Sequence, residues 1–119
     1  MPSHSEEFLR LANEAKARIK EVSPQEAAKL VSEGAILVDV REKEEFDKSH
    51  LPDAQHVSRG LLEMKIHEVA PDKTAPVVCY CAGGNRGALA ADTLQKMGYS
   101  NVVSIQGGLN ACSIEEEKA

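Results

Sequence analysis

The chain has 119 residues, of which 42% are hydrophobic, 28% are charged and only 3% are aromatic, and its formal net charge is −5. This length suits one domain with a single aliphatic core, and the balance of residues is typical of a globular rather than a disordered chain. The negative charge argues against a nucleic-acid surface, which needs a basic stripe.

The N-terminal segment 1–20 is predicted to be a helical extension. From Ser5 to Lys20 apolar residues recur at helical spacing, with charged residues on much of the other face, and Ser5 suits the N-cap position. We expect this helix to pack on the domain; a partner-binding helix is the alternative, and nothing in the sequence selects it. The apolar positions are Phe8, Leu11, Ala12, Ala15 and Ile19.

A helix and a buried strand follow. Ser23, Pro24 and Glu26 form a capping-box pattern that predicts a helix start, and Gly34 ends that helix. The run 35–40 is almost continuously apolar, which indicates a strand covered on both faces. Asp39 is the exception in this run. A buried carboxylate needs a partner, which Arg41 or Arg86 would supply, and we expect the role of this pair to be structural.

Strands and helices alternate through the rest of the chain. We predict strands at 55–58, at 77–80 and at 102–105, and helices at 61–66, at 88–97 and, in short form, at 107–112. Such alternation predicts an α/β fold, with a parallel sheet covered by helices on both faces. We assign residues 21–114 to this domain and residues 115–119 to a solvated acidic tail.

Cys81 lies where the strand 77–80 gives way to a helix. The first turn of a helix has unpartnered N–H groups and a partial positive charge, so it favours an anion, and Arg86 adds a full charge nearby. The same field favours thiolate over thiol, so we expect Cys81 to be a competent nucleophile. Gly83 and Gly84 allow the backbone to curl around an anion. Arg59 follows another predicted strand and is either solvated or brought toward this loop.

Other kinds of site have little support. Each histidine stands alone, and no Cys/His cluster has metal-ligand spacing, so we expect no metal. No apolar run is long enough to span a bilayer, and the polar start lacks a signal-peptide core. Three cysteines, an odd number, fit a reducing compartment better than a disulfide framework, so we expect a cytoplasmic protein with no membrane or nucleic-acid partner.

Four segments in order make the chain, from Val22 to Cys112, similar to the single-domain rhodanese (sulfurtransferase) family. The segments are Leu37–Glu42 with Glu45-Phe46, His50–Ala54, Tyr80–Arg86 and Gly107–Ala111. The resemblance implies a central, mostly parallel five-stranded sheet with helices on both faces. It also implies transfer of sulfane sulfur from thiosulfate or a persulfide donor to cyanide or a thiol, which a protein could carry, through a Cys81 persulfide.

The resemblance also assigns roles around Cys81. The backbone N–H groups of Ala82, Gly83, Gly84, Asn85, Arg86 and Gly87, with the Arg86 guanidinium, would hold the persulfide and the anionic end of the donor. No organic cofactor is implied. Related phosphatases typically carry a loop one residue longer than the four residues between Cys81 and Arg86, so phosphatase activity is the lesser alternative. A persulfide carrier or partner-binding regulatory module that does not turn over is the other alternative.

Two positions depart from the family pattern. Gly87 stands where the family often has Ser or Thr, so a hydroxyl is missing from the loop. Cys112 stands where the family often has an aromatic residue. We expect Cys112 to be a small buried residue; a thiol that resolves the Cys81 persulfide is the alternative. Cys79 is predicted to be an inert core thiol.

Overall fold

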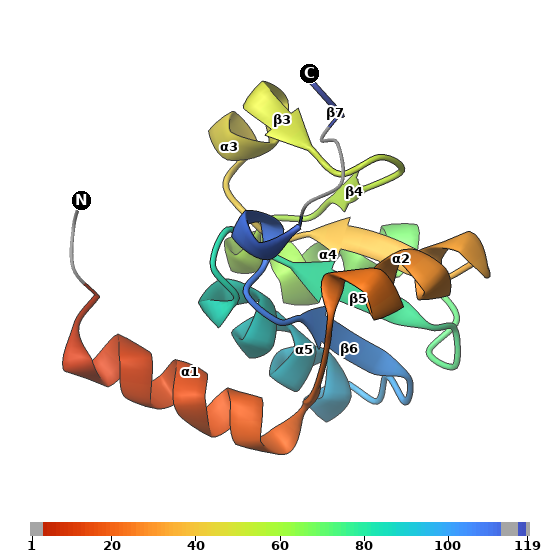
Figure 1. The fold of residues 1–119 in the computed structure, drawn as a ribbon. Helices are drawn as coiled ribbons and strands as arrows, with labels where there is room; N and C mark the ends of the chain where they lie inside the picture. The colour runs from red at the N-terminus through yellow and green to blue at the C-terminus, as the bar shows by residue number, and fades with distance from the viewer. Residues whose placement is uncertain (1–3, 113–116, 119) are drawn as a thin grey trace.

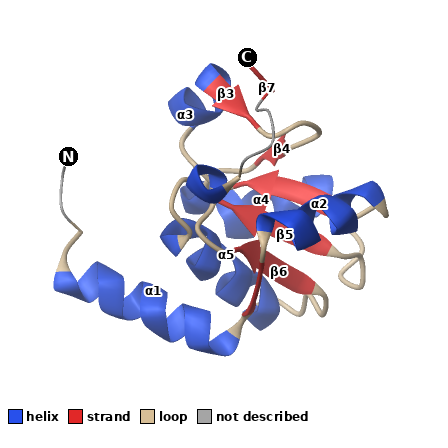
Figure 2. Cartoon of the chain, viewed as in Figure 1, coloured by secondary structure: helices blue, strands red, loops and turns tan. Residues whose placement is uncertain are grey.

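The computed structural model describes residues 4–112 and 117–118 of the chain (Figure 1). Helices and strands alternate along it, as Figure 2 shows. The elements in chain order are α1 (Glu6–Arg18), β1 (Lys20–Val22), α2 (Pro24–Ser32), β2 (Ile36–Asp39), α3 (Lys43–Lys48), β3 (Ser49–His50), β4 (Gln55–His56), the 3-10 helix η1 (Arg59–Leu61), α4 (Leu62–Val69), β5 (Val77–Tyr80), α5 (Asn85–Lys96), β6 (Val102–Ile105), the 3-10 helix η2 (Leu109–Ala111) and β7 (Glu117–Lys118).

Five strands form the central sheet in the order β1-β6-β5-β2-β4. Every neighbouring pair is parallel, so the predicted five-stranded sheet is confirmed. The middle strand β5 is buried along its whole length. Because parallel strands end at the same edge of a sheet, the residue after β5 lies at the centre of the edge where α/β proteins bind ligands.

Helices cover both faces of the sheet, as predicted. Side chains alternate along a strand, so Val78 and Tyr80 of β5 face α2, and Val77 and Cys79 face α4 and α5. Figure 2 shows α2 on one side of the strands and α4 and α5 on the other. The core is therefore two aliphatic clusters separated by the sheet.

Helix starts follow the predicted caps. Ser23 Oγ accepts a hydrogen bond from the N–H of Glu26 at 3.1 Å, and the Glu26 carboxylate accepts one from the N–H of Ser23 at 3.2 Å. Ser5 caps α1 by accepting from the N–H of Phe8 at 3.1 Å. These side chains satisfy N–H groups that the first turn leaves unpaired.

The predicted N-terminal helix packs on α5. Ala12 and Ala15 are fully buried, and Arg18 forms two hydrogen bonds with Asp92 of α5, at 2.9 and 2.8 Å. Leu11 does not follow its predicted inward position and is 48% exposed. The buried stripe of α1 therefore consists of two alanines, whose small side chains allow the helix to pack closely against α5.

The start of one helix and the pairing of one strand also differ from the prediction. Helix α5 begins at Asn85, three residues earlier than predicted, because Gly84 adopts a left-handed conformation (φ 107°) and serves as its N-cap. Strand β3 pairs antiparallel with β7 in a second, two-stranded sheet that the sequence did not predict. Of the predicted solvated acidic tail, residues 115, 116 and 119 lie outside the described residues, whereas residues 117 and 118 form β7. Within 4–112 and 117–118, no helix has both the length and the hydropathy to cross a membrane.

Candidate functional site

Cys81 is the first residue after β5 and lies at the centre of the site. Its side chain belongs to the core cluster under α5, and the residue is only 1% exposed. The N–H of Gly84 donates a hydrogen bond to Cys81 Sγ at 3.1 Å. The loop therefore turns back on its own thiol, and a backbone donor already points at the sulfur.

The loop passes directly into the first turn of α5. Asn85, Arg86 and Gly87 occupy the first three helical positions, whose N–H groups have no acceptor within the helix. Gly84 must be glycine because its φ is positive and an added Cβ would lie 3.2 Å from the Gly107 nitrogen. The structure thus places the thiol and the N–H of Gly84 in contact at the N-terminus of α5, next to the first-turn N–H groups of residues 85–87, where the dipole favours negative charge.

The loop is held from outside by the segment that contains Gly107 and Gly108. The N–H of Leu109 donates to the carbonyl of Cys81 at 2.8 Å, and the N–H of Asn110 donates to the carbonyl of Ala82 at 2.9 Å. Gly108 has φ 60°, and an added Cβ would overlap the Cys81 carbonyl oxygen and lie 2.6 Å from that of Ala82. These bonds give the carbonyls of Cys81 and Ala82 partners outside the loop and fix the loop to the segment that follows β6.

Arg86 is paired with Glu45 of α3. Its two terminal nitrogens donate to the two carboxylate oxygens of Glu45 at 2.7 and 3.0 Å, and both side chains are about one-third exposed. These bonds lower the pKa of the Glu45 carboxyl and raise the pKa of the Arg86 guanidinium. Sequence reasoning did not assign Glu45 a role, although Glu45 belongs to one of the four family segments.

Asp39 and Arg41 form a buried pair beside the loop. Asp39 is fully buried, and Arg41 donates to it from the backbone N–H at 2.9 Å and from the guanidinium at 2.8–3.1 Å. The guanidinium also donates to the carbonyl of Ser49 at 2.7 Å. Asp39 is expected from the sequence to pair with Arg41 or Arg86, and in the structure it pairs with Arg41. Through the Ser49 carbonyl, this pair connects the end of β2 to β3.

Arg59 points toward helices rather than toward the loop. Its guanidinium donates to Thr93 of α5 at 3.0 Å and to Glu63 of α4 at 3.3 Å. Its Nε is buried and has no hydrogen-bond partner among the described residues. In this conformation Arg59 braces α4 against α5, and no hydrogen bond joins it to residues 81–87 of the described chain.

The other two thiols lie in different surroundings. Cys79 is completely buried, and burial together with the Cys81 charge raises the pKa of its thiol to about 12, which agrees with an inert core thiol. Cys112 is half-buried, and its thiol donates to the carbonyl of Gly108 at 3.5 Å. Cys112 packs against the cluster on the α2 face, whereas Cys81 belongs to the cluster on the α5 face.

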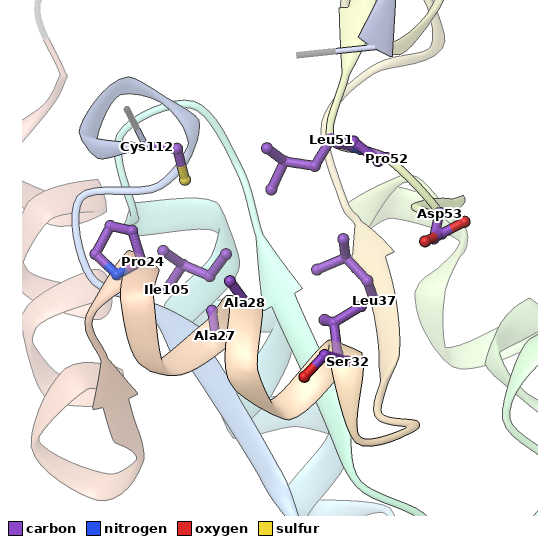
Figure 3. A pocket seen from close by; sticks show the side chains of 11 residues that line it. Pro24, Ala27, Ala28, Ser32, Leu37, Leu51, Pro52, Asp53, Ile105 and Cys112 are labelled. Atoms are coloured by element: carbon purple, nitrogen blue, oxygen red, sulfur yellow. The ribbon is translucent and has the colours of Figure 1, made fainter. Parts of the chain in front are cut away.

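A mainly apolar cavity of about 250 Å³ lies on the α2 face of the sheet. Figure 3 shows the sulfur of Cys112 at one end, Leu51 and Leu37 on one side, and Ala27 and Ala28 of α2 below. Cys81 does not line this cavity, so the cavity and the Cys81 loop are separate features. Among the residues that the structure describes, no group of three His, Cys, Asp or Glu side chains gathers as metal ligands would.

Comparison with known proteins gives consistent matches. Residues 23–115 match the family model described as the rhodanese-like domain. The chain is 39% identical over 89 residues to the thiosulfate sulfurtransferase GlpE of Pseudomonas syringae pv. syringae, an alignment that covers 75% of this chain and 82% of that protein.

Two solved structures are also similar. One is the polysulfide-sulfur transferase homodimer of Wolinella succinogenes, with a TM-score of 0.75, 32% identity and coverage of 87% of this chain and 80% of that one. The other is a Rhodopseudomonas palustris protein of unknown function, described as a possible tyrosine phosphatase, with a TM-score of 0.76, 30% identity and coverage of 93% and 92%.

Proposed function

Because the chain belongs to the rhodanese-like domain family, we propose that it transfers sulfane sulfur from a small anionic donor to cyanide or a thiol through a persulfide on Cys81. The donor is thiosulfate or a persulfide. The observation that carries the proposal is the thiol of Cys81 at the N-terminus of α5, with the N–H of Gly84 3.1 Å from the sulfur. That arrangement stabilises a sulfur anion in a nearly water-free place.

In the first half-reaction the Cys81 thiolate attacks the outer sulfur of thiosulfate. A sulfur–sulfur bond forms between Cys81 Sγ and that sulfur, the bond to the sulfonate group breaks, and its electron pair leaves with sulfite. The N–H groups of residues 84–87 face the charge that the persulfide retains.

In the second half-reaction the acceptor attacks the outer sulfur of the persulfide. With cyanide a carbon–sulfur bond forms, the sulfur–sulfur bond breaks, and the electron pair returns to Cys81 as thiolate. Thiocyanate leaves and the free enzyme is restored, so the cycle needs no external oxidant or reductant.

In this proposal Arg86 binds the anionic end of the sulfur donor while it remains paired with Glu45. A guanidinium has five N–H donors, and Glu45 takes two of them, so Arg86 keeps donors for the anionic end of the donor molecule. Glu45 fixes the direction in which those donors point. Asp39 and Arg41 hold the neighbouring strand ends, and Arg59 reaches the substrate only if it leaves Thr93.

A persulfide carrier is the second candidate. It is favoured by the burial of Cys81, which is 1% exposed, because a persulfide shielded from water and surrounded by donors can persist until a partner removes the sulfur. A protein thiol would then be the acceptor. In either case we place the protein in the reducing cytoplasm, where thiols such as that of Cys112 remain reduced.

The test is to incubate the protein with thiosulfate, measure the intact mass, and then add cyanide and measure thiocyanate. We expect a gain of one sulfur atom that maps to Cys81, and thiocyanate on repeated turnover. Cys81→Ala should abolish both, whereas Cys79→Ala, a change at a buried thiol two residues away, should retain both. A stable added sulfur with negligible turnover supports the carrier, and release of phosphate from phosphotyrosine with no sulfur added supports the phosphatase alternative.

A further inference from the structure

Ser104, in the middle of β6, has a hydroxyl group that the proposed reaction leaves unexplained. The residue is fully buried, and its Oγ has no hydrogen-bond partner among the residues that the structure describes. A buried hydroxyl without a partner loses its hydration and gains nothing in return. Such a group in a well-packed strand therefore calls for a partner that the resting chain does not offer.

The place of Ser104 in the sheet brings it under the Cys81 loop. Ser104 is the register partner of Cys79 in the β5–β6 pair. Because side chains alternate along a strand, and Val103 and Ile105 face α2, Ser104 faces α5, as Cys79 and Cys81 do. The hydroxyl thus lies between the sheet and the first turn of the helix that carries the loop donors.

Gly87 is the helix residue that covers this hydroxyl. A Cβ added at Gly87 would lie 3.0 Å from Ser104 Oγ and 3.4 Å from the backbone nitrogen of Cys81. Gly87 has no positive φ, so the close approach, and not the backbone conformation, accounts for glycine here. Gly87, Ser104 Oγ and the Cys81 backbone nitrogen therefore lie close together, with less room between them than a methyl group needs.

We propose that Ser104 is a positioning residue for Cys81 and that its hydroxyl donates to the Cys81 sulfur when that sulfur becomes negatively charged. The Gly84 N–H already bonded to the sulfur is then joined by a second donor, which comes from β6. A donor buried in a low-dielectric place stabilises an anion more than the same donor does in water. The proposal rests on the proposed role of Cys81 as the nucleophile.

The proposal also accounts for the absence of a hydroxyl at position 87. A serine there would bring its Cβ against Ser104 Oγ, so only one of the two positions accommodates a hydroxyl-bearing side chain without a shift of the neighbouring atoms. In this chain the hydroxyl stands on β6 and the helix residue is glycine. A hydroxyl moved from position 104 to position 87 should restore the same interaction from the other side.

The experiment measures the rate of Cys81 alkylation by iodoacetamide against pH in the full chain, with the modified residue localised by tandem mass spectrometry. We expect Ser104→Ala to raise the midpoint by about one pH unit, since a hydrogen bond to a charged group has about that effect. The kcat/KM for thiosulfate should fall about fivefold at acid pH and little at alkaline pH, where the thiolate forms without help. The double variant Gly87→Ser, Ser104→Ala should recover most of the wild-type alkylation midpoint and most of the wild-type kcat/KM at acid pH.

Cys79→Ala is the matched control, because it removes one buried heavy atom from the same face opposite Ser104. It should leave the midpoint unchanged. If Ser104 had only a structural role, Ser104→Ala would leave the pH midpoint of Cys81 alkylation unchanged. The variant would also be as stable as the wild type or more stable in urea unfolding, because an unsatisfied hydroxyl is lost. An unchanged midpoint, or an equal shift in Cys79→Ala, overturns the proposal. Alkylation needs no sulfur donor, so failure of sulfur transfer in the wild-type protein is recognised separately.

Discussion

Gly108→Ala provides a sharp test of how the Cys81 loop is held. Gly108 has φ 60° and ψ −154°, a region that is essentially restricted to glycine and costs another residue about 1–3 kcal/mol. The added Cβ would also overlap the Cys81 carbonyl, which accepts from Leu109 at 2.8 Å, and press on the Ala82 carbonyl, which accepts from Asn110 at 2.9 Å. The two hydrogen bonds contribute about 0.5–1.5 kcal/mol each. Together with the backbone cost, we expect the free energy of unfolding to fall by about 4 kcal/mol.

Urea unfolding measures this loss, and Gly60→Ala is the control. An added Cβ at Gly60 meets nothing within 4 Å, and its φ is not positive, so this change should alter stability by less than about 0.5 kcal/mol. Thiosulfate-dependent sulfur loading of Gly108→Ala should fall more than tenfold even under conditions in which the variant is folded, because the loop loses the hydrogen bonds that hold the Cys81 and Ala82 carbonyls. If Gly108→Ala matches Gly60→Ala in both measurements, the outer hydrogen bonds do not hold the loop.

Three further changes test the surroundings of the loop. Glu45→Gln should reduce kcat/KM for thiosulfate by about tenfold, because Arg86 loses its charged partner. Folding lowers the pKa of the Glu45 carboxyl, so the stability that this carboxylate contributes is present above the unfolded pKa of about 4.3 and is lost as the pH falls through the folded pKa. In urea unfolding, the free energies of unfolding of Glu45→Gln and of the wild type should therefore become equal in acid. Arg18→Ala should increase hydrogen exchange in α1 by loosening its contact with Asp92, with turnover kept within twofold, whereas a large loss of turnover would give α1 a catalytic role. Cys112→Ser should likewise keep turnover within twofold, and a tenfold loss would identify a resolving thiol.

Local signals in the sequence account for much of the fold and for the centre of the site. The capping box at Ser23 and the apolar run 35–40 depend on neighbouring residues, so they predict α2 and β2 directly. Cys81 is recognisable in the same way, because a strand precedes it and two glycines and an arginine follow it where a helix begins. The sequence pattern predicts the start of α5 three residues late, since it does not show that Gly84 takes the left-handed conformation that begins the helix.

Long-range partners could not be predicted because their residues look ordinary in the sequence. Glu45 lies on a short, charged helix and resembles a solvated residue until the fold brings Arg86 to it from 41 positions away. The pairing of β3 with β7 joins two segments of two residues each, too short for a periodic pattern. Ser104 did leave a signal, a polar residue inside an apolar strand. Asp39 is likewise a polar residue inside an apolar strand. Its need for a partner is predictable, because an unpaired buried charge costs more free energy than an unpaired buried hydroxyl.

The way the loop is fixed bears on the choice between sulfur and phosphate. Only Ala82, Gly83 and Gly84 lie between the end of the strand segment at Cys81 and the first turn of α5. Each end is constrained, by Leu109 on the Cys81 carbonyl and by Gly84 on the sulfur. A loop that is held at both ends cannot widen without breaking these hydrogen bonds, so we expect the size of the loop to limit which anion it accepts. A loop that instead accepts phosphate would show inorganic phosphate competing with thiosulfate for loading of Cys81, and we expect no such competition.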